Sequence, residues 1–140
     1  MDHLAALRQI LANEGVAEGR VRAGRLLDSD IDNDARPLLL LKWGGGAQAL
    51  AQGTLKVQDV RVDVWSYGHT PGEASAVHWH THRVLDAIRH QDIGAGVDVL
   101  TILWTKSAGG PLARTDPDLD WPMIHASRQV YSSVPTSSSA

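Results

Sequence analysis

The sequence contains no cysteine and no phenylalanine. Without cysteine the chain cannot form disulfides, thiolate metal sites or cysteine nucleophiles. It also has no block of Lys and Arg, which argues against a dedicated nucleic-acid groove, because such a groove needs clustered cations to displace counterions. No run approaches the roughly 18 apolar residues of a membrane span. Charged residues interrupt the apolar pattern of residues 1–15, so we expect no signal peptide.

The residues that are present suit one domain with a single core. The chain has 140 residues, 43% of them hydrophobic, and a formal net charge of −3. We expect the domain to span residues 1–134 and a solvated tail, PTSSSA, to follow at residues 135–140. Five Trp and two Tyr form the aromatic set. Because these residue types are enriched at protein interfaces, a partner surface is a reasonable expectation.

Two segments have the pattern of amphipathic helices. Residues 2–13 repeat leucine at helical spacing, and Asp2 can cap their first turn. The second helix is predicted from Pro71 to about residue 90. Thr70 and Glu73 form a capping box ahead of it, and proline suits the first helical position. Its predicted buried face consists of Val77, Thr81, Val84, Leu85 and Ile88.

Four segments have the composition of strands. They are residues 37–43, 54–67, 97–106 and 123–134. In the second segment Val60, Val62 and Val64 alternate with polar or aromatic residues, which indicates one buried face. Leu55 lies on the opposite parity, so we expect a register shift near Gln58, at a β-bulge.

The intervening segments read as connections. We expect residues 16–36 to form a long loop with a short extended piece at Val21, residues 44–53 a flexible connection, and residues 108–122 a turn-rich excursion. The loop 16–36 and the tail are expected to be the least ordered parts of the free subunit. The order of elements predicts an α+β fold, with a mainly antiparallel sheet of about four strands and two helices packed on one face.

The histidines of His78-Trp79-His80-Thr81-His82 are the main candidate for metal chemistry. On a helix His78 and His82 share a face, whereas His80 is rotated away, and no third ligand is evident nearby. We therefore expect solvated or interface histidines and no intrinsic metal. Trp79 lies opposite the apolar face of the helix, which favours either a second layer or a partner surface.

No other pattern in the sequence requires catalysis. Asp116, Asp118 and Asp120 match the first ligands of a calcium loop, but the glycine and the final glutamate are absent. The glycines at 44–46 lack the Lys and Ser or Thr of a phosphate loop. No nucleophile-elbow pattern surrounds Ser107 or any other serine. We expect no cofactor and no enzymatic activity.

The order of these pieces resembles that of the tail terminator (tail completion) proteins of long-tailed bacteriophages. The resemblance spans roughly residues 2–134 and is specific for about 60–134. It is carried by VRVDVWSYG (60–68), the helix start TPGEA (70–74), the helix end RVLDAI (83–88) and the excursion GGPLARTDPDLDWP (109–122), and the PLLLLKW strand and the N-terminal helix fit as well. In that family the excursion lies between the last two strands.

The resemblance implies a structural role in the virion. Members of the family form a ring, in this case most simply a hexamer, that stops tail-tube polymerisation and presents the surface for head joining. The implied partners are further copies of the chain, the tail tube protein and the head-tail connector or stopper protein. Genomic DNA would pass through the channel without sequence readout, and no membrane is involved. The implied location is the neck of the virion, assembled in the host cytoplasm.

Two other functions stay open at this point. One is another neck component, such as a head-completion or head-tail adaptor protein. The other is a small metal-dependent enzyme that uses His78 and His82.

Aromatic and charged residues outside the apolar stripes are the candidates for subunit or tube contacts. They are Trp65, Tyr67, Trp79, Arg114, Asp116, Asp118 and Trp121. We expect the excursion Gly109–Pro122 to be an interaction element, because it is longer than a hairpin connection requires and is stiffened by prolines. In the alternative interpretation, Trp121 folds back over the core of its own subunit.

Overall fold

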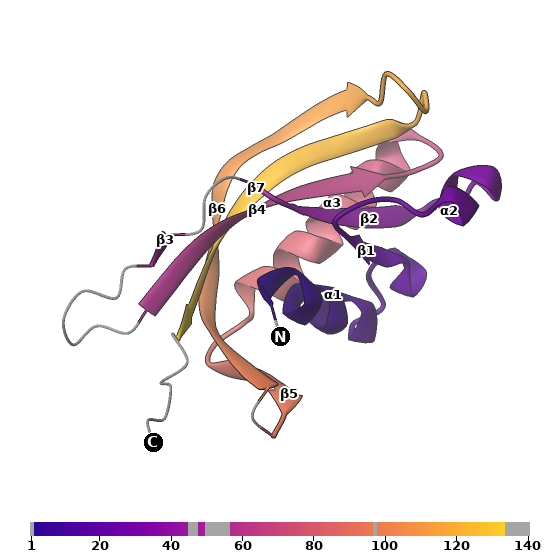
Figure 1. Ribbon diagram of the computed structural model, residues 1–140. Coiled ribbons are helices and arrows are strands. Elements are labelled where there is room, and N and C mark those ends of the chain that lie inside the picture. The colour runs from indigo at the N-terminus through magenta and orange to yellow at the C-terminus, as the bar shows by residue number, and fades with distance from the viewer. Residues whose placement is uncertain (1, 45–47, 50–56, 97, 134–140) are drawn as a thin grey trace.

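The computed structural model of this chain describes residues 2–44, 48–49, 57–96 and 98–133. Two longer helices, α1 (His3–Asn13) and α3 (Pro71–Asp86), pack against one face of a curled β-sheet (Figure 1). The predicted α+β class is therefore confirmed, whereas the predicted count of two helices is not exact, because a short third helix spans Asp28–Asp32. The predicted tail at 135–140 lies outside the described residues.

The sheet contains more strands than the sequence predicted. Its strands are β1 (Val21–Ala23), β2 (Leu38–Trp43), β3 (Gln48–Ala49), β4 (Val57–Tyr67), β5 (Gln91–Ala95), β6 (Asp98–Thr115) and β7 (Pro122–Ser133). Six of them follow the order β1-β2-β4-β7-β6-β5, and β3 pairs with β4. Only β1 and β2 are parallel, which confirms a mainly antiparallel sheet. The prediction of about four strands is therefore wrong. The three shortest strands contain too few residues to show an alternating pattern in the sequence, so they were not predicted.

Both longer helices begin at the positions that the capping residues in the sequence predicted. The Asp2 carboxylate accepts the Ala5 N–H at 2.7 Å, and the Thr70 hydroxyl accepts the Glu73 N–H at 3.1 Å. The Glu73 carboxylate accepts the backbone N–H of His69 at 2.7 Å, one residue before the position that a standard capping box uses. Helix α3 ends at Asp86, earlier than predicted, and β5 starts soon afterwards.

The main core lies between the two helices and the sheet. Val60, Val62 and Val64 of β4 are buried in it, as the alternation predicted. Strand β4 pairs with β7 in one continuous register from Val57 to Tyr67. The register shift expected near Gln58 is therefore wrong within the described part of this strand.

Most of the predicted loop 16–36 has regular structure. It contains a 3₁₀ turn, η1 (Val16–Gly19), strand β1 and a short helix, α2 (Asp28–Asp32). The extended piece expected at Val21 is confirmed, but the prediction that residues 16–36 form one long loop is wrong. Of the connection predicted over 44–53, residues 45–47 and 50–53 lie outside the described part, and Gln48–Ala49 pairs with β4.

The predicted excursion 108–122 is mostly one arm of a long hairpin. Strand β6 continues to Thr115 and pairs with β7 up to Pro122, so the loop assignment is wrong for this part. Register shifts between Ser107 and Leu112 absorb the glycines and the proline that suggested turns. Gly110 is required there, since its φ is +82° and a Cβ would lie 2.7 Å from the His125 carbonyl oxygen.

A second apolar cluster covers the opposite face of the sheet at one end. Its buried members are Leu38, Leu40, Tyr67, Trp121 and Met123. The turn that follows β6 is held by Asp116, whose Oδ1 accepts the N–H groups of Asp118 at 2.9 Å and Leu119 at 3.0 Å. This turn places Trp121 over the sheet.

Candidate functional site

The predicted interface residues divide into buried and exposed groups. Tyr67 and Trp121 are buried together, with their rings edge-to-face and 5.6 Å between centroids. The Arg36 guanidinium lies 4.8 Å from the Trp121 ring centroid, and the Tyr67 hydroxyl donates to Asp116 Oδ2 at 3.2 Å. Of the two interpretations of Trp121, the structure favours the one in which it packs on its own subunit.

Trp65 lies on the sheet face opposite the helices, which we call the outer face. It is half-buried and stacks on His125 at 4.3 Å between centroids. Arg114 and Asp118 are exposed near the far end of the β6–β7 hairpin. These three residues stay accessible, although the structure does not gather them into one cluster.

The outer face also exposes two large apolar residues that the sequence reasoning missed. Trp104 stacks on Tyr131 at 4.8 Å between centroids, and Leu112 is 51% exposed further along β6. Both are paired with β7 residues on the outer face. The signal for Leu112 was hidden because its segment was interpreted as a turn, so no face could be assigned to it.

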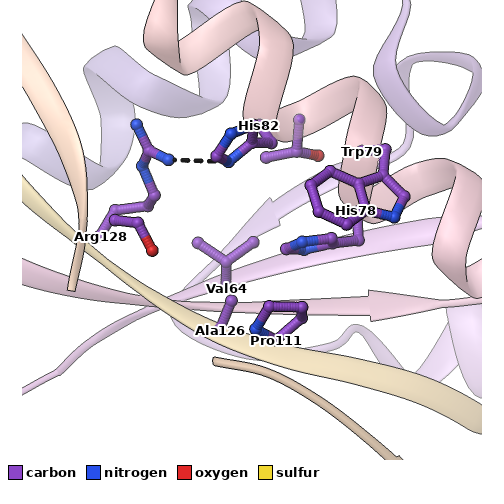
Figure 2. Close-up of a pocket in the computed structure, with 9 residues that line it drawn as sticks. Val64, His78, Trp79, His82, Pro111, Ala126 and Arg128 are labelled. Carbon is purple, nitrogen blue, oxygen red and sulfur yellow. Dashed lines mark hydrogen bonds between the residues drawn. The ribbon is translucent and has the colours of Figure 1, made fainter. Parts of the chain in front are cut away.

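Trp79 stands at the rim of a pocket between α3 and the β6–β7 hairpin (Figure 2). Its side chain is 50% exposed, as its position opposite the apolar stripe predicted. The pocket has a volume of about 40 Å³, which is room for a water or the tip of a side chain. Its lining consists of Val64, His78, Trp79, Thr81, His82, Ser107, Pro111, Ala126 and Arg128.

Arg128 of β7 forms a polar network along one wall of this pocket. Its side chain is almost completely buried, and its Nη2 donates to Asp86 and, at 2.7 Å, to the Thr105 hydroxyl. Nη1 donates to His82 Nδ1 at 3.1 Å. The proton of neutral His82 therefore sits on Nε2, which lies 2.8 Å from Asp86 Oδ2. The network fixes the last turn of α3 to the sheet.

Two buried nitrogens among the lining residues have no partner within the described part of the chain. They are His78 Nε2 and Arg128 Nε. Burial lowers the pKa of His78, and the nearby positive charge of Arg128 lowers it further. His78 is therefore neutral at pH 7. With apolar walls from Val64 and Pro111, the pocket suits a group that combines apolar atoms with a hydrogen-bond acceptor.

The histidine cluster is poorly arranged for a metal. Among the residues that the structure describes, no group of three or more His, Cys, Asp or Glu could hold an ion. Both ring nitrogens of His82 already have partners, Arg128 and Asp86. The absence of an intrinsic metal stays a prediction. Elemental analysis of protein purified without added metal should find far less than one zinc per chain.

Comparison with known proteins adds no identification. No protein-family model matches the chain, and no curated protein matches its sequence. In the described residues, no helix has the length and apolar character needed to cross a membrane.

Proposed function

We propose that this chain is a ring-forming structural subunit of a bacteriophage tail, acting as the tail terminator at the head-proximal end of the tube. One observation carries the proposal: large apolar side chains are exposed at separate places on the surface of the subunit. Trp79 lies on α3, Trp104 and Leu112 lie on the outer face of β6, and Leu27, Ile31 and Trp43 lie on or beside α2 and β2. A ring needs two different patches on each subunit, because each copy contacts its two neighbours through different surfaces.

The sequence resemblance supplies the particular role. The hairpin end from Gly109 to Pro122 carries one of the motifs on which the resemblance depends, and it leaves Arg114 and Asp118 exposed. A rigid hairpin with charges of both signs suits a contact with the tail tube protein or with the head-tail connector or stopper protein. The ring would cap the last tube ring and so stop further addition of tube subunits.

The net charge is compatible with this role. At −3, the chain has no excess of cations that would hold a DNA phosphate backbone during passage through a channel. DNA would therefore pass without sequence-specific contacts. Assembly would take place in the host cytoplasm, and the mature location would be the virion neck.

The test is a tube-capping assay with purified components. Tail tube protein that polymerises in the presence of this chain should stop growing, and electron microscopy should show a ring of this subunit at one end of each tube. Native mass spectrometry of the assembled material should give six copies of the 15.1 kDa chain. Unchanged tube growth, or images of the neck without such a ring, would rule the proposal out.

The same assay separates this role from another neck component. A head-completion or head-tail adaptor protein would bind the connector when both connector and tube are offered, and it would leave tube growth unaffected. Binding to the tube alone, or to the tube first, supports the terminator.

A further inference from the structure

We propose that the open edge of strand β6 at residues 112–115 binds a short extended segment of a different protein, which adds to the sheet as a further strand. The segment that fits has an apolar side chain on the face toward α3 and an acidic side chain beside Arg114. The proposal goes beyond the proposed function and does not depend on it, because the site belongs to the single subunit.

One side of β6 is unpaired along most of its length. Strand β5 pairs with residues 98–102, and β7 pairs with the other side of β6 as far as Thr115. Past Ile102 no described strand pairs on the side of β5, and Figure 1 shows this orange arm of β6 at the free margin of the sheet. Besides water, an extended backbone is the group that matches such a row of donors and acceptors, which fixes the class of occupant.

Hydrogen bonds at the end of the hairpin show which groups face the open edge. The Asp116 N–H donates to the Trp121 carbonyl oxygen at 2.9 Å, across the hairpin toward β7. Successive residues of a strand direct their N–H and C=O groups to opposite sides, so those of Thr115 and Ala113 face the open edge. Both residues are exposed, and each offers one donor and one acceptor.

The upstream part of the same edge is protected, which confines the site. Register shifts between Ser107 and Leu112 interrupt the ladder with β7, and Pro111 has no N–H to donate. Bulges and prolines are devices that keep strand edges from pairing. From Leu112 to Thr115 the register is regular again. The bound segment therefore needs only a few residues.

A pocket beside the open edge provides room for a side chain of this segment. It lies between β6 and the start of α3, and its lining includes Pro71, Ala113 and Ile124. Its volume is about 260 Å³, which is below the roughly 300–1,000 Å³ of small-molecule sites. Because neighbouring strands present their side chains next to each other on each face, an apolar side chain of the added strand would enter the pocket.

The charges along the edge select the partner. Between residues 104 and 115, β6 contains two cations, Lys106 and Arg114, and no carboxylate. Arg114 is exposed, so a carboxylate on the added strand can form a cross-strand pair with it. Symmetric pairing of residues 112–115 with a second copy would instead bring two Arg114 side chains together, and like charges on facing strands are destabilising. The occupant is therefore an acidic, apolar segment of another chain.

Amide exchange measured by NMR on the isolated subunit tests the pairing. The probe is a capped octapeptide that alternates valine with glutamate, added up to about 1 mM. In the free subunit the amide of Arg114, which faces β7, should exchange slowly, and those of Ala113 and Thr115 should exchange rapidly. Bound peptide should slow exchange at Ala113 and Thr115 at least tenfold and leave Arg114 unchanged.

A single substitution removes one donor from the edge. Ala113→Pro deletes an N–H that faces away from β7, and proline is tolerated at such edge positions. The loss of one hydrogen bond should weaken peptide binding about fivefold or more. Ala113→Val is the matched control, because it adds similar bulk but keeps the N–H, and it should bind within about twofold of the natural chain.

Three results would overturn the proposal. They are unchanged peptide binding by Ala113→Pro, rapid exchange at Ala113 and Thr115 at the highest peptide concentration, and slow exchange there in a self-associated subunit without peptide, which would make a second copy the occupant. If Ala113→Pro does not fold, the exchange measurement on the natural chain decides alone. The tube-capping assay is independent of all three results, so a failure here is distinguishable from a failure of the proposed function.

Discussion

At the residue scale, Trp121 and Trp79 differ in what surrounds them. Trp121 is buried against Tyr67 and Arg36, so Trp121→Ala should lower the free energy of unfolding of the isolated subunit by about 3–5 kcal/mol. Trp79 is half-exposed and packs on His78 and His82, so Trp79→Ala should lower that free energy by less, about 1 kcal/mol. Urea unfolding of the free subunit measures both values. Equal losses from the two variants would contradict this division.

Helix α2 is held to the sheet by a single buried carboxylate, Asp30. Hydrogen bonds from Arg22 lower the pKa of Asp30 in the folded chain, more than burial raises it. Asp30→Asn should therefore lower the free energy of unfolding at pH 7 by about 1–3 kcal/mol, since it removes a charge-assisted pair. Asp32→Asn is the matched control, because Asp32 is exposed on the same helix and should have almost no effect.

The pH dependence of this contribution has a definite sign. Because the folded-state pKa of Asp30 is lowered, its stabilisation is complete above the ordinary aspartate value of about 3.9 and is lost as the pH falls through the folded-state value. The difference between the natural chain and Asp30→Asn should therefore shrink below about pH 4. A difference that stays constant from pH 7 to pH 3 in the same unfolding assay would be inconsistent with an ionised Asp30 in the fold.

At the element scale, α3 depends on its N-terminal cap. Thr70→Ala removes the hydroxyl that accepts the Glu73 N–H, and should lower the free energy of unfolding by about 1 kcal/mol. Thr70→Ser retains an acceptor at this position and should recover most of that loss. Thermal unfolding followed by circular dichroism gives both comparisons, and a Ser variant as unstable as the Ala variant would argue against the cap.

Features set by neighbours in the sequence could be predicted for these elements. The caps at Asp2 and Thr70 and the alternation of β4 depend on residues a few positions apart, and each is found as expected. Segment 16–36 was misassigned because α2 depends on the Asp30–Arg22 pair, and β1 forms by pairing with β2. Neither contact leaves a periodic pattern in the local sequence.

Strand β6 also could not be predicted from its local sequence. Gly109, Gly110 and Pro111 are turn formers by local propensity, yet pairing with β7 draws them into an 18-residue strand with shifted register. The pocket was equally hidden, because His78, Ser107 and Arg128 come from three elements that only the folded sheet brings together. Sequence reasoning singled out Trp79 as a possible interface residue and His78 with His82 as a possible metal pair, and it missed Arg128 completely.

At the scale of the whole molecule, ring assembly should reduce solvent access at exposed apolar parts of the subunit. We expect backbone amide exchange to slow at residues 27–32 and 76–82 when the subunit enters a ring, because contacts between neighbouring copies would cover the exposed apolar side chains of Leu27, Ile31 and Trp79. Hydrogen exchange with mass spectrometry compares free and assembled protein. The double variant Leu27→Asp with Ile31→Asp is the control, and it should show neither ring formation nor slowed exchange.

The strand order has a consequence for how the chain reaches this structure. Strand β7 lies between β4 and β6, although it follows both of them in the sequence. Tyr67 pairs with Met123 and Val57 with Ser133, so the central ladder joins residues far apart along the chain. During translation, β4 and β6 therefore leave the ribosome before the strand that unites them exists, and each presents an open edge until β7 emerges. Such long-range pairing makes folding slow and leaves the nascent chain prone to aggregation.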